Sequence, residues 1–174
     1  MGRALIVSAG ASSNEYIAAR LAEMGYARPV ILPSGAEARR RMPDADFDLI
    51  VVNAPLPDEF GHELCMDAVA STDAGVVFLV KAAQAEQLLT PLNEQGVLLL
   101  SKPFSNTLFV QAMHMAAASN HRLQRLRQEN ARLQEIAMQP DAPFLGAGMG
   151  TGDVIGIIPT LDATVFVAMT EDGK

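Results

Sequence analysis

The sequence predicts an α/β fold built on a five-stranded, doubly wound parallel sheet. Five short apolar runs recur at intervals of roughly 20 to 25 residues, and each is rich in Val, Ile and Leu with little alternation. Strands covered on both faces have this pattern, and the amphipathic stretches between the runs predict the covering helices. The five runs are residues 4–7, 29–32, 49–52, 76–80 and 97–100.

Signals for helix starts and ends separate these runs. Ser12 and Ser34 are each followed three residues later by a glutamate, which is the spacing of a capping box at a helix N-terminus. Gly25 and Gly96 lie where a helix should end before the next strand, and Pro43 should end the second helix. The predicted order is therefore strand then helix, repeated five times.

Composition predicts one ordered domain without disulfides. The 174 residues carry a formal net charge of −7, and 49% of them are hydrophobic, which is enough for one core. The single cysteine, Cys65, excludes an internal disulfide, and no apolar run has the length of a membrane span. We therefore expect a cytoplasmic protein that binds no membrane, and the acidic balance argues against coating of nucleic acid by the whole chain.

The fifth helix is expected to begin near Ser105 and to continue as a coiled coil. Its small and apolar residues alternate at spacings of three and four, as in the a/d seam of a heptad repeat. A polar Asn130 at an a position favours a parallel homodimer, whereas the alternative is a surface helix that packs on its own domain. The seam residues are Ala116, Ser119, Leu123, Leu126, Asn130, Leu133 and Ala137, and we expect Leu123, Leu126, Asn130 and Leu133 to carry dimerisation.

The chain is predicted to divide into three parts. Residues 1–118 form the α/β domain, and residues 119–138 form a stalk that continues the last helix. Residues 139–174 begin as a Gly- and Pro-rich linker and end in two β-prone runs, which predict an irregular tail or a short hairpin.

Functional side chains of a doubly wound sheet gather at the carboxyl ends of its strands. In this sequence the residues at those ends are Ser8, Ala9, Asn53, Lys81 and Lys102. None of them is a carboxylate or a cysteine, so the expected site has hydroxyl, amide and ammonium groups only.

Residues 3–118 resemble the receiver domain of bacterial two-component response regulators. Asn53 stands where the family has its phosphoacceptor aspartate, and Pro57 and Gly61 keep the family's offsets of four and eight residues from it. Lys102 and Pro103 match the lysine–proline pair after the fifth strand, and the peptide between them is commonly cis in the family. The resemblance implies the sheet order 2-1-3-4-5.

Departures from the family's pattern imply that the phosphorylation chemistry has been lost. The amide of Asn53 has no anionic oxygen to attack a phosphoryl donor. The acidic pair that holds Mg²⁺ in the family falls on Ser8 and Ala9, although a hard cation prefers carboxylate oxygens. The phosphate-reading hydroxyl falls on Lys81 and the aromatic switch residue on Leu99. We therefore expect no metal, no cofactor and no enzymatic activity.

Lys81 and Lys102 raise a question of charge, because two facing ammonium groups are unfavourable without a counter-charge. A small bound anion would supply that charge. In the arrangement that we expect instead, Lys81 turns outward or pairs with Asp58 or Glu59 on the neighbouring loop.

Residues 1–137 further resemble clostridial-type members of the ANTAR family of transcription antitermination regulators. The segments that carry this resemblance are residues 4–39, 53–64, 80–82, 101–103 and 127–133. In that family the stalk leads into a three-helix RNA-binding module, but residues 139–174 have no three-helix pattern, so no RNA-binding residue is carried over. The resemblance implies a dimerising regulator of antitermination with RNA as a partner. The alternative is an adaptor that binds a kinase or forms heterodimers with full-length relatives.

Overall fold

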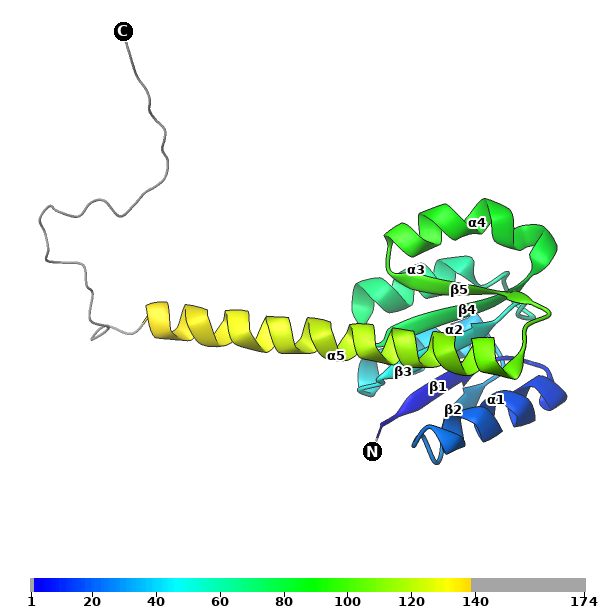
Figure 1. Cartoon of the computed structure of the whole chain (residues 1–174), viewed down its shortest axis with the longest axis horizontal. Helices are drawn as coiled ribbons and strands as arrows, with labels where there is room; N and C mark the ends of the chain where they lie inside the picture. Colours follow the sequence, from blue (N-terminus) through cyan, green and yellow to red (C-terminus); the bar gives the residue numbers. More distant parts are fainter. Residues whose placement is uncertain (1, 139–174) are drawn as a thin grey trace, which may run out of the picture. The chain divides into compact units, whose positions relative to one another are not determined.

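Strands and helices alternate along the chain as the spacing of the apolar runs predicts, and the computed structural model describes residues 2–138 (Figure 1). The tail expected at residues 139–174 lies outside the described residues. The elements in chain order are β1 (Ala4–Val7), α1 (Ala11–Glu23), β2 (Val30–Leu32), α2 (Gly35–Arg41), the short 3-10 helix η1 (Met42–Asp44), β3 (Leu49–Asn53), α3 (His62–Ser71), β4 (Gly75–Lys81), α4 (Ala82–Glu94), β5 (Val97–Lys102) and α5 (Asn106–Ala137).

The five strands form one parallel sheet in the order β2-β1-β3-β4-β5, which confirms the predicted topology. The order reverses between β1 and β3, and the carboxyl ends of strands at such a switch point are where doubly wound sheets hold functional sites. On the other side of β3, the register of β4 and β5 sets Lys81 directly opposite Lys102. The sheet therefore brings Ser8, Asn53, Lys81 and Lys102 to the same edge.

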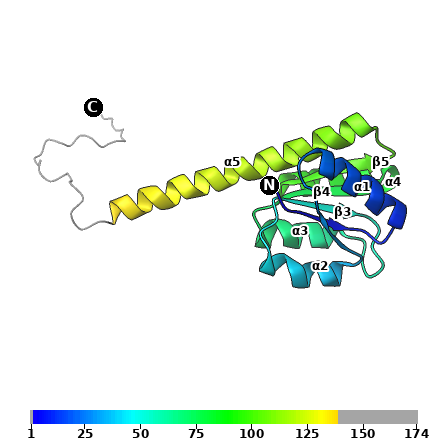
Figure 2. The ribbon, with the colours of Figure 1, turned by 90° about the horizontal axis from the view of Figure 1, so that it is seen from below.

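Helices cover both faces of the sheet, which explains why the strands are apolar without alternation. Ile50 and Phe78 belong to the core under α2, α3 and α4, whereas Val51 and Leu79 belong to the core under α1 and α5. Figure 2 shows α1 and α5 on one side of the sheet and α2 and α3 on the other.

One of the two predicted helix caps is present. The Ser34 hydroxyl accepts a hydrogen bond of 3.3 Å from the backbone amide of Glu37 and caps α2, as predicted. The prediction for Ser12 was wrong, because α1 begins at Ala11 behind the backbone of Gly10 and has no side-chain cap. The residues Gly25 and Gly96 do follow α1 and α4, with φ of +100° and +94°.

The first part of α5 is held firmly against the sheet. Phe109 and Ala116 are buried in the core, so Ala116 packs inside the domain and not in an exposed seam as the heptad spacing suggested. The Asn120 amide donates a hydrogen bond of 3.1 Å to the backbone carbonyl of Asp48. Gly75 at the start of β4 lets the helix approach closely, because a Cβ there would lie 2.3 Å from the Ala116 carbonyl oxygen. Residues up to Arg127 belong to one compact unit, and Gln128 begins a second.

Candidate functional site

A chain of hydrogen bonds links the ends of β1, β3 and β5. The amide nitrogen of Asn53 donates to the Ser8 hydroxyl at 3.0 Å, and the Lys102 ammonium donates to the amide oxygen of Asn53 at 2.8 Å. The ammonium also donates to the backbone carbonyl of Ala54 at 2.7 Å. Both ends of the Asn53 amide are therefore engaged, and the side chain has one fixed orientation.

The Lys102 ammonium is bound by two neutral carbonyl oxygens, those of the Asn53 amide and the Ala54 backbone. Burial lowers the pKa of Lys102, and the positive charge of Lys81 lowers it further. Within residues 2–138 no carboxylate contacts this ammonium, and the two oxygen atoms that do contact it belong to amide groups. Ser8 is 1% exposed and interior to the site, so its hydroxyl satisfies a buried donor that would otherwise be unpaired.

The other two strand-end residues lie outside this network. Ala9 is exposed on the turn that leads to α1, and Lys81 is exposed at the N-cap position of α4. The expected pairing of Lys81 with Asp58 or Glu59 is wrong, since both acids have other partners. Asp58 accepts hydrogen bonds from the backbone amides of Gly35 and Ala36 at 3.0 and 2.9 Å. Lys81 therefore follows the outward arrangement.

The loop after β3 is fastened to α2. The backbone amides at the start of α2, that of Ala36 first, hold the pKa of Asp58 below its usual value. Glu59 forms an ion pair with Arg39 of α2, whose guanidinium also reaches Asp67 of α3 at 2.6 Å. The hydrogen bonds to the carboxylates of Glu59 and Asp67 raise the pKa of Arg39 above its usual value. The loop is thus fastened to α2, and the same arginine ties α2 to α3.

The motif residues of this loop have clear conformational roles. Gly61 precedes α3 with φ of +112°, a left-handed conformation that favours glycine, and an added Cβ would press on Phe78 and Val52. Pro57 is exposed on the turn. The Lys102–Pro103 peptide is cis, as the resemblance implied, and so is the Ala54–Pro55 peptide.

Three contacts of this region were missed by sequence reasoning. They are the Ser8–Asn53 hydrogen bond, the Ala54 carbonyl that accepts from Lys102, and the brace from Arg39 to Glu59. The Ser8–Asn53 hydrogen bond was predictable in principle, because the Asn53 amide needs an acceptor and Ser8 is a hydroxyl residue at the neighbouring strand end. The other two depend on backbone and side-chain positions that no motif records.

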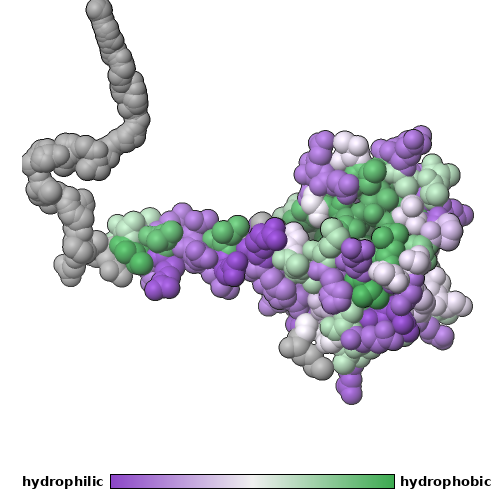
Figure 3. Space-filling model, viewed as in Figure 1, coloured by the Kyte–Doolittle hydropathy of each residue, from purple (hydrophilic) through white to green (hydrophobic). Residues whose placement is uncertain are grey.

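The four predicted dimerisation residues all lie in α5, and the side chain of Leu123 is not described. Leu126 is 50% exposed and Leu133 is 62% exposed, and Asn130 between them is also exposed. Figure 3 shows apolar patches separated by polar side chains along the C-terminal part of this helix. The described side chains of these four residues are therefore exposed and not packed in the receiver core.

The cysteine, histidine and acidic residues outside this network are the remaining candidates for chemistry in the part of the chain that the structure describes. Cys65 is fully buried, and burial raises the pKa of its thiol. Within residues 2–138, no group of three or more His, Cys, Asp or Glu side chains is placed to hold a metal ion. In the same stretch, none of the helices has the length and apolar character needed to cross a bilayer.

Comparison with known proteins rests on structure, since no protein-family model and no curated protein matches the chain. The signal receiver domain of an HD domain-containing protein from Pseudomonas fluorescens Pf-5 is 17% identical, with a TM-score of 0.63 over 71% of this chain and 92% of that chain. The beryllofluoride-activated NtrC4 receiver domain dimer is 24% identical, with a TM-score of 0.61 over 69% of this chain and 99% of that one.

A third similar structure is a receiver domain with a bound metal ion. The receiver domain of a sensor histidine kinase from Pseudomonas aeruginosa PAO1 holds a magnesium ion in its active-site cleft; it is 20% identical, with a TM-score of 0.54 over 67% of this chain and 98% of that chain. The sheet order and these likenesses together establish the receiver fold for this chain.

Proposed function

We propose that this chain is a receiver-type signalling module that accepts no phosphoryl group and acts as a dimerising regulator. The observation that carries this proposal is the closed hydrogen-bond chain from Ser8 through Asn53 to Lys102. A phosphoacceptor must present an anionic oxygen to the donor, whereas the amide of Asn53 is neutral and is bonded at both ends.

The residues at the strand ends also supply few oxygen ligands for a cation. Mg²⁺ needs oxygen ligands in a nearly octahedral arrangement and usually takes one or two carboxylates. Ser8 offers one buried hydroxyl that already accepts from Asn53, and Ala9 offers a methyl group. The Lys102 ammonium next to Asn53 adds a positive charge that opposes cation binding.

A phosphorylation assay tests the first half of the proposal. Beryllofluoride with Mg²⁺ should leave the amide NMR signals around Asn53 unchanged, and acetyl phosphate should leave the mass of the chain unchanged. The variant Ala9→Asp/Asn53→Asp adds two carboxylates at an exposed and a partly buried position, and it is the matched control that should respond. Specific shifts around Asn53 in the wild type would refute the proposal.

Dimerisation through α5 is the second half. Leu126, Asn130 and Leu133 are exposed at heptad spacing, and an asparagine at an a position pairs best with itself in a parallel dimer. Light scattering of the full chain should therefore give twice the chain mass. A strictly monomeric chain at all accessible concentrations would remove this half and leave the receiver proposal standing.

The regulated process that we propose is transcription antitermination, because the sequence resembles the ANTAR regulators over residues 1–137. A second candidate is an adaptor for a kinase or for full-length relatives. It is favoured by the Gly- and Pro-rich composition of residues 139–153, where those regulators begin their RNA-binding module.

Ultraviolet crosslinking in the native cell, followed by sequencing of RNA attached to this protein, separates the two candidates. Enrichment of hairpin-bearing leader transcripts would support antitermination. A level of RNA equal to that of an uncrosslinked control would support the adaptor, and co-purified proteins would then identify the partner.

A further inference from the structure

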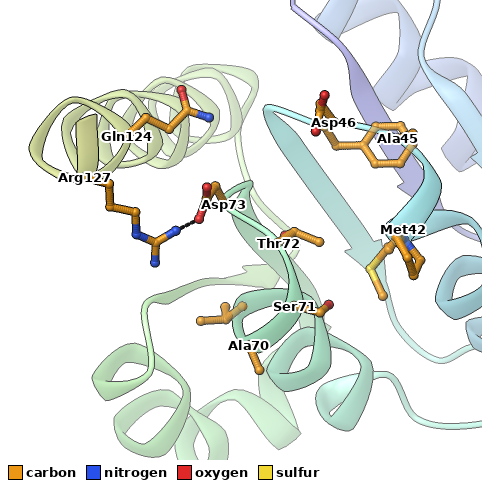
Figure 4. A pocket seen from close by; sticks show the side chains of 12 residues that line it. Met42, Ala45, Asp46, Ala70, Ser71, Thr72, Asp73, Gln124 and Arg127 are labelled. Carbon is orange, nitrogen blue, oxygen red and sulfur yellow. Dashed lines mark ion pairs between the residues drawn. The ribbon is translucent and has the colours of Figure 1, made fainter. Parts of the chain in front are cut away.

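One ion pair joins α5 to the body of the receiver. Arg127 of α5 contacts Asp73, which lies in the turn between α3 and β4. The pair lies beside an open cleft of about 360 Å³. Figure 4 shows Gln124 of the same helix near Arg127, and Asp46 across the cleft. Both partners are largely exposed, so the pair contributes little to the stability of the fold. The position of Arg127 on α5 matters more, because it lies beside the surface through which the helix is proposed to pair.

Arg127 flanks the expected pairing surface of α5. With Leu126 at a d position and Asn130 at an a position, Arg127 takes the e position and Arg122 takes the preceding g position. These are the two positions that face a partner helix across a coiled coil. Arg122, Arg127 and the seam residue Ser119 also line one open groove, in keeping with their predicted places beside and on the seam.

Parallel pairing would bring these two arginines together. In a parallel dimer a g residue faces the e residue five positions later in the partner, so Arg122 would face the partner's Arg127. That contact occurs twice by symmetry, and like charges at such positions repel. An antiparallel pair centred on the same leucines would oppose Glu129 to Glu129 and Arg127 to Arg127, and would separate the two copies of Asn130.

We propose that Asp73 is the counter-ion that permits two copies of this chain to pair in parallel through α5. The carboxylate of Asp73 takes up the charge of Arg127 within each chain, so Arg122 of the partner meets a neutralised neighbour. The receiver body thereby contributes a specificity-determining residue to the pairing of the helices. This inference rests on the dimer proposed above and goes beyond it by naming the partner's orientation and the contact that permits it.

The dimer dissociation constant of the full chain tests the inference, measured by sedimentation at low salt. Asp73→Asn should raise it roughly five-fold, since two repulsive contacts of a few tenths of a kcal/mol each are exposed. Asp46→Asn is the matched control, because it removes the same charge from the same cleft and should change nothing. The effect of Asp73→Asn should vanish near 1 M salt, where the Debye length is about 3 Å.

A second variant separates a counter-ion from a simple tether. Arg127→Gln removes the repelling charge itself, so it should leave the dissociation constant at or below the wild-type value. If Asp73 only tethered the helix, Arg127→Gln would weaken the dimer as much as Asp73→Asn, and that result would overturn the inference. Equal constants for Asp73→Asn and the wild type would overturn it too.

Orientation is measured independently with Leu133→Cys. A d-position cysteine lies opposite its own copy in a parallel dimer and should form an intermolecular disulfide on mild oxidation, whereas the native Cys65 is buried. Absence of that disulfide in a dimeric chain would overturn the parallel arrangement. A monomeric wild type would instead refute the proposed dimer itself, so the two failures are distinguishable.

Discussion

Substitution of Gly75 by alanine should loosen the seat of α5 on the sheet. An alanine Cβ at this position would lie 2.3 Å from the carbonyl oxygen of Ala116 and 2.6 Å from its carbonyl carbon. Both atoms belong to the helix backbone, so no side-chain rotation relieves the contact. The whole helix, or the first residue of β4, must therefore move.

The expected cost follows from that geometry. Overpacking of a well-filled core costs about 1–3 kcal/mol, and a backbone clash belongs to the upper part of this range. Loss of glycine's freedom in the unfolded chain returns about 0.4–1 kcal/mol. The net destabilisation should be about 2 kcal/mol, which is a large fraction of the roughly 5–15 kcal/mol of a typical domain.

Urea unfolding followed by circular dichroism measures this loss. With a slope of about 1.5 kcal/mol per molar urea, the midpoint should fall by a little over 1 M at matched protein concentration. Gly10→Ala is the control, since its Cβ would only touch Ser13 at 3.5 Å; it should cost at most about 1 kcal/mol as a poorer helix cap. A Gly75→Ala midpoint equal to that of the control would refute the account of how α5 is seated.

Three further predictions concern charge and pairing. Lys102→Met should remove part of the pH dependence of the unfolding free energy. The folded pKa of Lys102 is lowered, so its contribution to the unfolding free energy rises with pH until about 10.5; a wild-type minus variant difference that stays flat from pH 7 to 10 would contradict this. Arg39→Met should cost about 1–2 kcal/mol in urea unfolding because it leaves two carboxylates without their partner, whereas Arg41→Met on the same helix should cost little; equal losses would contradict the brace. Leu126→Asp should raise the dimer dissociation constant at least ten-fold by placing charge in the seam, and an unchanged molar mass in light scattering would remove Leu126 from the interface.

The fold was predictable because its signals are local and repeated. Buried parallel strands must be apolar on both faces, so the sequence marks each one directly, and Gly25 and Gly96 mark the ends of two helices. The predicted cap at Ser12 is absent because several neighbouring residues could serve equally well and none is used. Two serines and an asparagine near the start of α1 each offer a capping oxygen, and the chain instead begins the helix earlier, behind Gly10, with no side-chain cap.

The site was predictable in its members but not in its bonds. Strand order brings Ser8, Asn53 and Lys102 together, and motif spacing is enough to find them. The partner of Lys102 at Ala54 is a backbone carbonyl, which every residue has, so no pattern identifies it. Ion pairs such as that of Asp73 with Arg127 join segments far apart in sequence and depend on where a helix lies over a turn.

The presence of an amide and not a carboxylate at position 53 accounts for several other features of the site together. A carboxylate accepts hydrogen bonds only, whereas an amide also has a donor that must be satisfied when it is enclosed. The hydroxyl of Ser8 satisfies that donor, and a carboxylate at position 8 would be costly there without a cation, because position 8 is 1% exposed. With Lys102 held by Asn53 and Ala54, and the β3–α3 loop braced by Arg39, this edge of the sheet has one arrangement that needs no ligand. Under the function proposed above, the signal would pass through the partner that the last helix meets, so the variants of α5 are the decisive test of that proposal.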